Sequence, residues 1–447
     1  MSNEVAELKI GQRITCDMGV ATVKGLLGSG GQASVYLVEI NRRDYALKLL
    51  KENLCKPVVR NNILRIIKED FGSAAFIKPI SFVELGARFG CIMEIIPKHF
   101  YTCNSYCGGA KIPELGDEQI VLAPDQITRI CINICDALRR LHSKQLVHKD
   151  ISGENVMFNP DTAEVVVIDN DNVTPIGMGA QIWGTAEFMA PQLVSRKDRS
   201  RPNLQSENHS LAVLLFLMLV VEHPLKGLNY SRLAAKGLEE SHILNEILSL
   251  DKARFIFERD DDSLIDRDDE AHVQAYERWC LYPAYIKRMF HRCFVDGIAT
   301  PTLRPTAIQW EKELVRFLGC FYTCPHCGGL YVYDRDQFRN GSVPKCDDCG
   351  RWMEVARMCA EVDNEGEPKV ITLTDGAKLP RILFDLDADD KFAPGIGARI
   401  RGGGIELENY SCDMTYRGRR IPTGASSVLI YSGDQIDING KTYNVKL

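Results

Sequence analysis

The segment LVHKDISGENVM at 146–157 constrains the fold of this chain more than any other part of the sequence. It places Asp150 five residues before Asn155, and a strand-like run, VVVID, then ends at Asp169, fourteen residues after Asn155. Carboxylate and amide oxygens are hard ligands that suit a divalent cation. The amide of Asn155 on a loop and the carboxylate of Asp169 at the end of the following strand are therefore predicted to bind a divalent metal ion.

A glycine-rich run, GSGGQASV at 28–35, lies between two predicted strands. Glycines let the backbone close over phosphate groups and offer unobstructed N–H donors. Taken alone, such a run is more typical of a plain β-turn. No helix follows directly, which argues against a Rossmann or Walker loop. Lys48 ends the strand-like YALK thirteen residues after Val35 and supplies a cation near the loop. The candidate phosphate-binding glycines are Gly28, Gly30 and Gly31.

In this order and spacing, the segments resemble the protein kinase family, in which they correspond to the glycine loop, the V-A-I-K strand, H-R-D-L-x-x-x-N and D-F-G. The resemblance implies ATP as the phosphoryl donor, with Lys48 on its α- and β-phosphates. Asp150 would accept or orient the proton of the attacking hydroxyl. Asn155 and Asp169 would bind Mg²⁺ or Mn²⁺, and the acceptor would be a protein substrate.

The segment Met93-Glu94-Ile95-Ile96 resembles the kinase hinge, where backbone groups bind adenine. Apolar residues from three predicted strands would enclose the base. Any of them alone would be simple core, so their assignment depends on the resemblance. The implied nucleotide-binding residues are Val35, Ala46, Met93, Glu94, Ile96 and Met157.

Further along, GTAEFMAPQ at 184–192 resembles the end of an activation segment, and LRPTA around Arg304 resembles the late helical region of protein kinases. Gln192 stands where A-P-E has its glutamate, so its contact with Arg304 would be a neutral hydrogen bond rather than an ion pair. Glu207 stands where the family has an aspartate on a buried helix.

The catalytic loop also departs from the family pattern. Lys149 replaces the arginine, Ser152 replaces the lysine of Ser/Thr kinases, and Asn170 replaces the D-F-G phenylalanine. Ser152 would also suit an aminoglycoside- or choline-kinase-like loop, which keeps a small-molecule kinase open as an alternative. The segment 184–192 argues against it. A pseudokinase scaffold is the second alternative.

The glutamate that pairs with the ATP lysine in kinases is not evident in the expected helix at 58–68. That helix has Arg60, Asn61 and Asn62 near the expected position, with Asn61 at about the right turn. Two arrangements follow. Lys48 pairs with Asp169 until metal and ATP arrive, which we favour, or the flanking Glu52 or Glu69 swings in.

Two cysteine pairs, CPHCGG and CDDCG, form a C-x2-C…C-x2-C pattern with eighteen residues between the pairs. A glycine after each pair permits the tight turn. Four thiolates at this spacing are typical of a closed, structural zinc site. The predicted Zn²⁺ ligands are Cys324, Cys327, Cys346 and Cys349.

The C-terminal residues are rich in glycine and β-branched residues, and Asn439-Gly440 between QIDI and KTYNV is a hairpin signal. Residues 429–438 resemble the closing strands of a forkhead-associated domain. An unrelated β module is an equal alternative, since the phosphothreonine pocket of that family is not evident and no binding residue is carried over.

Composition limits the remaining possibilities. The net charge of −6 gives no basic field for nucleic acid, and the longest apolar run, Leu211–Val221, is too short for a bilayer and predicts a buried helix. The N-terminus lacks the apolar core of a signal peptide, so sixteen cysteines indicate a reducing compartment, the cytoplasm. We expect no membrane or nucleic-acid partner.

The length of 447 residues predicts several domains. The expected fold class is α+β: a bilobal kinase at 1–318, with a small lobe at about 1–96 and a large lobe at about 97–318, a zinc ribbon at 319–358 and a small β sandwich at 361–447. The whole loosely resembles bacterial stress-operon kinases, which implies a PP2C-like phosphatase and a von Willebrand-type protein as partners.

Overall fold

The computed structural model describes residues 7–109, 118–178, 184–195, 201–334, 343–362, 367–424 and 426–447. The chain folds into two compact units, Met1–Trp310 and Glu311–Leu447. Among the described helices, none combines the length and the apolar character that a bilayer span requires.

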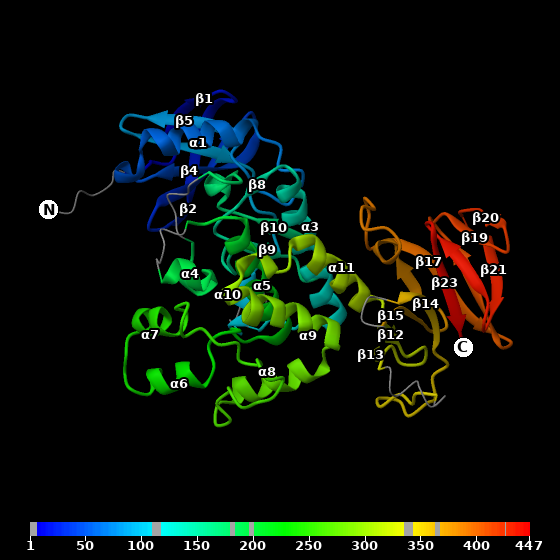
Figure 1. The fold of residues 1–447 in the computed structure, drawn as a ribbon. Coiled ribbons are helices and arrows are strands. Elements are labelled where there is room, and N and C mark those ends of the chain that lie inside the picture. The colour runs from blue at the N-terminus through cyan, green and yellow to red at the C-terminus, as the bar shows by residue number, and fades with distance from the viewer. Residues whose placement is uncertain are drawn as a thin grey trace. The chain divides into compact units, whose positions relative to one another are not determined.

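The first unit begins with a six-stranded antiparallel sheet, drawn in blue in Figure 1. In spatial order it consists of β1 (Arg13–Cys16), β2 (Gly19–Ser29), β3 (Ala33–Ile40), β4 (Arg43–Leu50), β6 (Arg88–Met93) and β5 (Ser81–Leu85). The strands alternate buried and less buried residues, as a two-faced sheet requires. Asn41 and Arg42 both have positive φ, 50° and 65°, which gives the β3–β4 hairpin its tight turn.

The two faces of this sheet have different covers. One face carries an apolar cluster that includes Val38, Leu47 and Ile92. The other packs Leu50 against Ile63 of helix α1 (Pro57–Lys68). Lys48 is two residues before Leu50 in β4, so it lies on the same face of the sheet as helix α1. On that face, the strand register places Val35 of β3 opposite Lys48.

Helices dominate the rest of the first unit (Figure 1). They are α2 (Cys103–Cys107), α3 (Pro124–Ser143), α4 (Pro191–Val194), α5 (Leu204–Val220), α6 (Leu228–Ala234), α7 (Glu240–Ile247), α8 (Glu270–Leu281), α9 (Ala284–His291), α10 (Gly297–Ala299) and α11 (Ala307–Leu318), the last of which continues into the second unit. The apolar run at 211–221 forms most of α5, which begins with a capping box between Asn203 and Ser206 and is buried on nearly all sides. Phe216 of α5 packs against the Trp279 and Phe290 rings.

Short strands connect these helices to the sheet. β9 (Val156–Phe158) pairs with β10 (Val165–Val167) and with β7 (Tyr101–Thr102), and β8 (Leu146–Val147) pairs with β11 (Thr174–Pro175). The loops that follow β8 and β10 hold the predicted catalytic and metal residues. Both loops therefore start from hydrogen-bonded strands.

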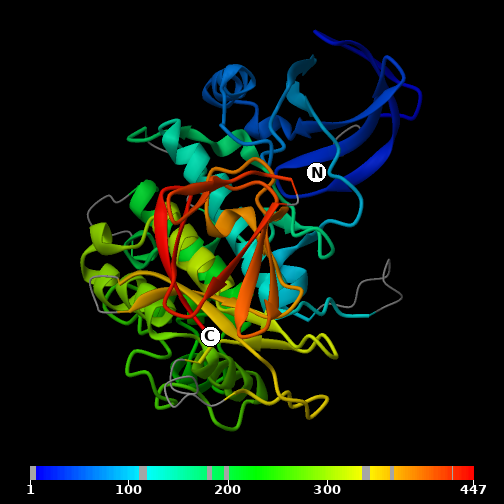
Figure 2. The ribbon, with the colours of Figure 1, turned by 90° about the vertical axis from the view of Figure 1, so that its right-hand side faces the viewer.

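In the second unit the described elements after α11 are strands and one short 3₁₀ turn, drawn from yellow to red in Figure 2. β12 (Phe321–Thr323) and β13 (Leu330–Val332) form a hairpin. A six-stranded sheet contains β15 (Pro368–Leu373), β14 (Ala356–Val362), β23 (Lys441–Lys446), β22 (Gln435–Ile438), β19 (Met414–Tyr416) and β20 (Arg419–Ile421). A four-stranded sheet contains β16 (Lys378–Pro380), β17 (Pro394–Arg401), β18 (Gly404–Asn409) and β21 (Ser426–Tyr431). Asn439 and Gly440 form the predicted hairpin turn between β22 and β23.

Candidate active site

Asp150 lies on the loop after β8 and its carboxylate is held from two directions. Asn155 donates from Nδ2 to Asp150 Oδ2 at 3.2 Å and to the Asp150 carbonyl at 2.9 Å. Thr185 donates from its backbone N–H and from its hydroxyl to Asp150 Oδ1, both at 2.9 Å. The contact with Thr185 was not predicted from the sequence, although Thr185 lies in the quoted segment 184–192. It joins that segment to the candidate catalytic acid.

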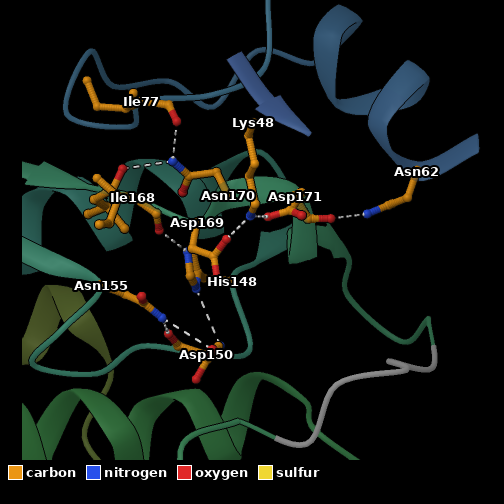
Figure 3. Close-up of polar contacts among 11 residues, drawn as sticks. Lys48, Asn62, Ile77, His148, Asp150, Asn155, Ile168, Asp169, Asn170 and Asp171 are labelled. Carbon is orange, nitrogen blue, oxygen red and sulfur yellow. Dashed lines mark hydrogen bonds and ion pairs between the residues drawn. The ribbon is translucent and has the colours of Figure 1, made fainter. Parts of the chain in front are cut away.

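His148 lies between the Asp150 loop and the end of β10 (Figure 3). The ring is fully buried, its Nδ1 accepts from the Asp150 N–H at 3.3 Å, and its Nε2 lies 3.2 Å from the Ile168 carbonyl. These partners select the tautomer with the proton on Nε2. His148 therefore ties the backbone of Asp150 to the residue before Asp169.

Glu207 of α5 supports the same loop. Its Oε2 accepts from the Lys149 N–H at 2.6 Å, and its Oε1 lies 2.7 Å from His142 Nε2. Burial would raise the pKa of Glu207, but the hydrogen bond and charge of His142 and the Lys149 N–H outweigh it and lower the pKa below its usual value. Lys149 itself has a φ of 69°, a conformation that a non-glycine residue keeps only when its surroundings enforce it.

Lys48, Asp169 and Asp171 form the second half of the site (Figure 3). Lys48 Nζ pairs with Asp169 Oδ1, as expected, and also lies 2.9 Å from Asp171 Oδ1. Burial would lower the pKa of Lys48, but Asp171 and Asp169 outweigh it and raise that pKa. Burial raises the pKa of Asp171, whereas Lys48 lowers the pKa of Asp169 despite burial. Asp169 adopts a left-handed backbone conformation with a φ of 59°.

The prediction for helix α1 is wrong in one detail, because Asn62 and not Asn61 faces this cluster. Asn62 donates from Nδ2 to the Asp171 carbonyl at 2.5 Å, and Asn61 is exposed. One residue corresponds to a rotation of about 100° around a helix, so a one-residue error moves the side chain to another face. Glu69 pairs with Arg65 at 3.0 Å and Glu52 is exposed. In this structure neither glutamate replaces the missing partner of Lys48.

Asn170, at the position of the D-F-G phenylalanine, is also fully buried. Its Nδ2 donates to the Ile77 carbonyl at 2.9 Å and to the Val167 carbonyl at 2.7 Å. Its Oδ1 is buried without a hydrogen-bond partner. A polar link between the segment before β5 and the end of β10 thus occupies the position where the family has an apolar contact.

The residues implied for adenine lie along the same face of the first sheet. Ala46 is opposite Met93, and Val35 is opposite Lys48, so these four side chains share one face. Met157 lies in β9 and is half-buried. The remaining implied residues surround this face: Gly28, Gly30 and Gly31 at the exposed β2–β3 turn, and Glu94 and Ile96 after β6. Their roles in nucleotide binding stay predictions.

The end of segment 184–192 is anchored as the sequence suggested. Arg304 Nη2 donates to Gln192 Oε1 at 2.9 Å, and Arg304 Nε donates to the Gly297 carbonyl. Arg304 is 2% exposed, so this neutral hydrogen bond satisfies part of a buried guanidinium.

Four cysteines converge in the second unit. The sulfurs of Cys324, Cys327, Cys346 and Cys349 all lie within 4.8 Å of one another. The Cys324–Cys349 and Cys327–Cys346 sulfur distances are 3.8 and 3.5 Å. Sulfurs at the usual zinc distance of about 2.3 Å would be about 3.8 Å apart in a tetrahedron. Gly328 and Gly350 follow the two pairs with φ of 80° and 69°, so each tight turn uses a conformation that glycine permits.

A family model described as the protein kinase domain matches residues 21–309. The chain is 27% identical over 212 residues to the serine/threonine-protein kinase PknB of Mycobacterium leprae, covering 45% of this chain and 32% of that protein. It is 24% identical over 242 residues to the serine/threonine-protein kinase PrkC of Bacillus subtilis, covering 52% and 34%. The matches thus span about a third of the length of these two relatives.

Among solved structures, the kinase domain of PknI from Mycobacterium tuberculosis matches with 14% identity and a TM-score of 0.43, covering 69% of this chain and 98% of that chain. This TM-score adds no weight to the family match.

Proposed function

Because this chain belongs to the protein kinase family, we propose that it is a bacterial-type Ser/Thr protein kinase that transfers the γ-phosphate of ATP to a protein hydroxyl. The observation that carries the proposal is the double contact of Thr185 with Asp150. It links the segment that resembles a protein kinase activation segment to the candidate base. An acceptor hydroxyl near that segment would then meet Asp150, which would orient it and take up its proton.

The other residues have complementary roles in this proposal. Lys48 would hold the nucleotide phosphates, and the glycine turn would close over them. Asp169 and Asn155 would hold Mg²⁺ or Mn²⁺, which would neutralise charge on the β- and γ-phosphates. These residues fit a cation. The pKa of Asp169 is held below its usual value, and Asn155 uses Nδ2 on Asp150, which leaves Oδ1 as the ligand atom.

The test is a transfer assay on the purified chain with radiolabelled ATP, Mg²⁺ and a generic protein acceptor. We expect metal-dependent labelling of the acceptor or of the chain itself, and none with Asp150→Asn. Parallel reactions with an aminoglycoside and with choline test the small-molecule alternative. Labelling of those compounds without protein labelling would contradict the proposal, and no transfer at all would favour a scaffold.

For the second unit we propose that Cys324, Cys327, Cys346 and Cys349 bind one structural Zn²⁺ in a zinc ribbon, and that the later strands form an interaction domain. The sulfur distances given above support the zinc site. Because the four cysteines must be in the reduced form to bind a metal ion, we propose a cytoplasmic location. The loose resemblance to stress-operon kinases leads us to propose a signalling or stress pathway, with a PP2C-like phosphatase and a von Willebrand-type protein as partners. Co-purification of the full chain with those proteins tests the partners.

A further inference from the structure

The charge that faces Lys48 does not come from helix α1. The α1 sequence, PVVRNNILRIIK, contains no acid. Lys48 and Asp171 meet at 2.9 Å, and each side chain is 11% exposed. A buried ammonium is stable only beside a carboxylate, because desolvation of an unpaired charge is expensive. Asp171 is 123 residues away in the sequence, in the 3₁₀ turn that follows Asp169.

We propose that Asp171 is the anionic partner that holds Lys48 in position for the nucleotide phosphates, in place of a glutamate on helix α1. Asp171 is thus a positioning residue that acts through Lys48. The inference rests on the proposed kinase function. It extends our expectation that Lys48 pairs with Asp169 until metal and ATP arrive.

The different roles proposed for Asp169 and Asp171 support this assignment. Asp169 pairs with Lys48 in this structure, but it is also the candidate metal ligand. A carboxylate that binds a cation has less charge to share with an ammonium. Lys48 then needs a second carboxylate. Asp171 can supply it, because its Oδ1 lies 2.9 Å from Lys48 Nζ and its side chain is 11% exposed.

Helix α1 contributes to the arrangement through a neutral amide. Asn62 donates to the Asp171 carbonyl at 2.5 Å, and Arg65 Nη2 orients Asn62 by donating to its Oδ1 at 2.8 Å. The ion pair itself lies between β4 and the turn at 170–172. A displacement of α1 would therefore break the hydrogen bonds that Asn62 and Arg65 donate to the Asp171 and Val173 carbonyls, and it would leave the charge of Lys48 neutralised. In a kinase with a helix glutamate, the same displacement would separate the ion pair.

The test is a double-mutant cycle in the full-length chain, with Asp171→Asn, Lys48→Met and the combination. Asn has nearly the shape of Asp and removes the charge. We expect Asp171→Asn to lower kcat/KM for ATP by about tenfold to a hundredfold, and to change it by less than about twofold when Lys48 is already Met. Glu69→Gln is the matched control, because it removes an acid next to α1 that does not contact Lys48, and it should leave kcat/KM within about twofold.

Two results would overturn the proposal. One is a single Asp171→Asn variant with kcat/KM within about twofold of the parent chain. The other is additive losses in the double variant, which would mean that Asp171 acts independently of Lys48, for instance on the metal. Circular dichroism checks folding, and Asp171→Ser replaces Asp171→Asn in the cycle if the latter fails to fold.

The proposed function can fail separately. If the parent chain transfers no phosphate, the same cycle is measured on the affinity for Mg·ATP by calorimetry. We then expect Asp171→Asn to weaken binding in the parent chain and not in the Lys48→Met chain. Equal weakening in both, or in neither, contradicts the role of Asp171.

Discussion

The two sides of the candidate active site follow the kinase pattern to different degrees. On the Asp150 side, the acid, the amide and the buried histidine occupy the expected motif positions, and a buried carboxylate, Glu207, supports the loop as an aspartate would. On the Lys48 side, a helix amide and a second aspartate replace the helix glutamate.

This difference indicates which requirements are chemical and which are structural. The groups that would touch the acceptor hydroxyl and the metal have few chemical substitutes, because proton transfer and cation binding need particular atoms. The partner of Lys48 only has to be a buried carboxylate at the right distance. It can therefore come from another segment of the chain.

Asp169 belongs to both sides, so its removal should have the largest effect. Asp169→Ala should abolish Mg²⁺-dependent transfer to below detection, because it removes both the candidate metal ligand and a charge beside Lys48. Transfer assays on the folded variant check this. Retained activity would show that other residues hold the metal, and it would contradict the statement that Asp169 serves both sides of the site.

Asp150→Asn should affect the Asp150 side of the site and not the Lys48 side. It should lower the transfer rate by about 10²–10⁴-fold, the usual range for loss of a general base, and leave Mg·ATP affinity nearly unchanged. Single-turnover rates and calorimetry measure the two quantities. A large loss of ATP affinity would place Asp150 on the nucleotide and contradict its assignment to the acceptor hydroxyl.

Zinc removal should leave both sides of the site intact. We expect one zinc per chain by elemental analysis, and chelation or Cys346→Ser should destabilise the second unit by several kcal/mol, since structural zinc contributes folding free energy directly. Kinase activity of the treated chain should persist. Metal-replete protein without zinc would refute the site, and loss of activity on chelation would show that the zinc site supports the catalytic residues.

Glu207→Gln tests the buried carboxylate that holds the loop of Asp150. The variant should lower the free energy of unfolding by about 1–3 kcal/mol at pH 7, because the buried carboxylate accepts from Lys149 and pairs with His142. The folded state lowers the pKa of Glu207, so its contribution is present above the usual glutamate range and is lost as pH falls through the lowered value. The difference between parent and variant should therefore narrow on acidification. Denaturant unfolding at several pH values measures this difference in the free energy of unfolding. A difference that grows at acidic pH would contradict the supporting role of the Glu207 carboxylate.

The smallest effects should come from Glu52→Gln and Glu69→Gln. Neither acid contacts Lys48 in the structure, so each variant should keep the transfer rate within a few-fold, whereas Lys48→Met loses orders of magnitude. Steady-state rates on the three variants decide this. If either glutamate variant fell as far as Lys48→Met, that glutamate would be the missing partner of Lys48.

Sequence spacing predicted the kinase family because the motif residues lie on short loops whose order is fixed by the chain. It also predicted the apolar helix α5 and the Asn439-Gly440 hairpin, since an uninterrupted apolar run and turn chemistry are local signals. It missed the ion pair of Lys48 with Asp171, which depends on a contact between residues 123 positions apart. An acid at the position of the D-F-G glycine was the available signal. It could not distinguish Asn61 from Asn62, because the rotation of α1 is set by packing.

The buried amide of Asn170 has a consequence for chemical probes of this protein. A compound that displaced this side chain would leave the Ile77 carbonyl without the N–H that Asn170 donates. It would also remove one of two donors from the Val167 carbonyl, which accepts from the Ile77 N–H as well. An apolar inhibitor group designed to fill the pocket of a phenylalanine would therefore bind poorly. A group that carries an N–H donor would be selective for this chain over kinases with phenylalanine at that position.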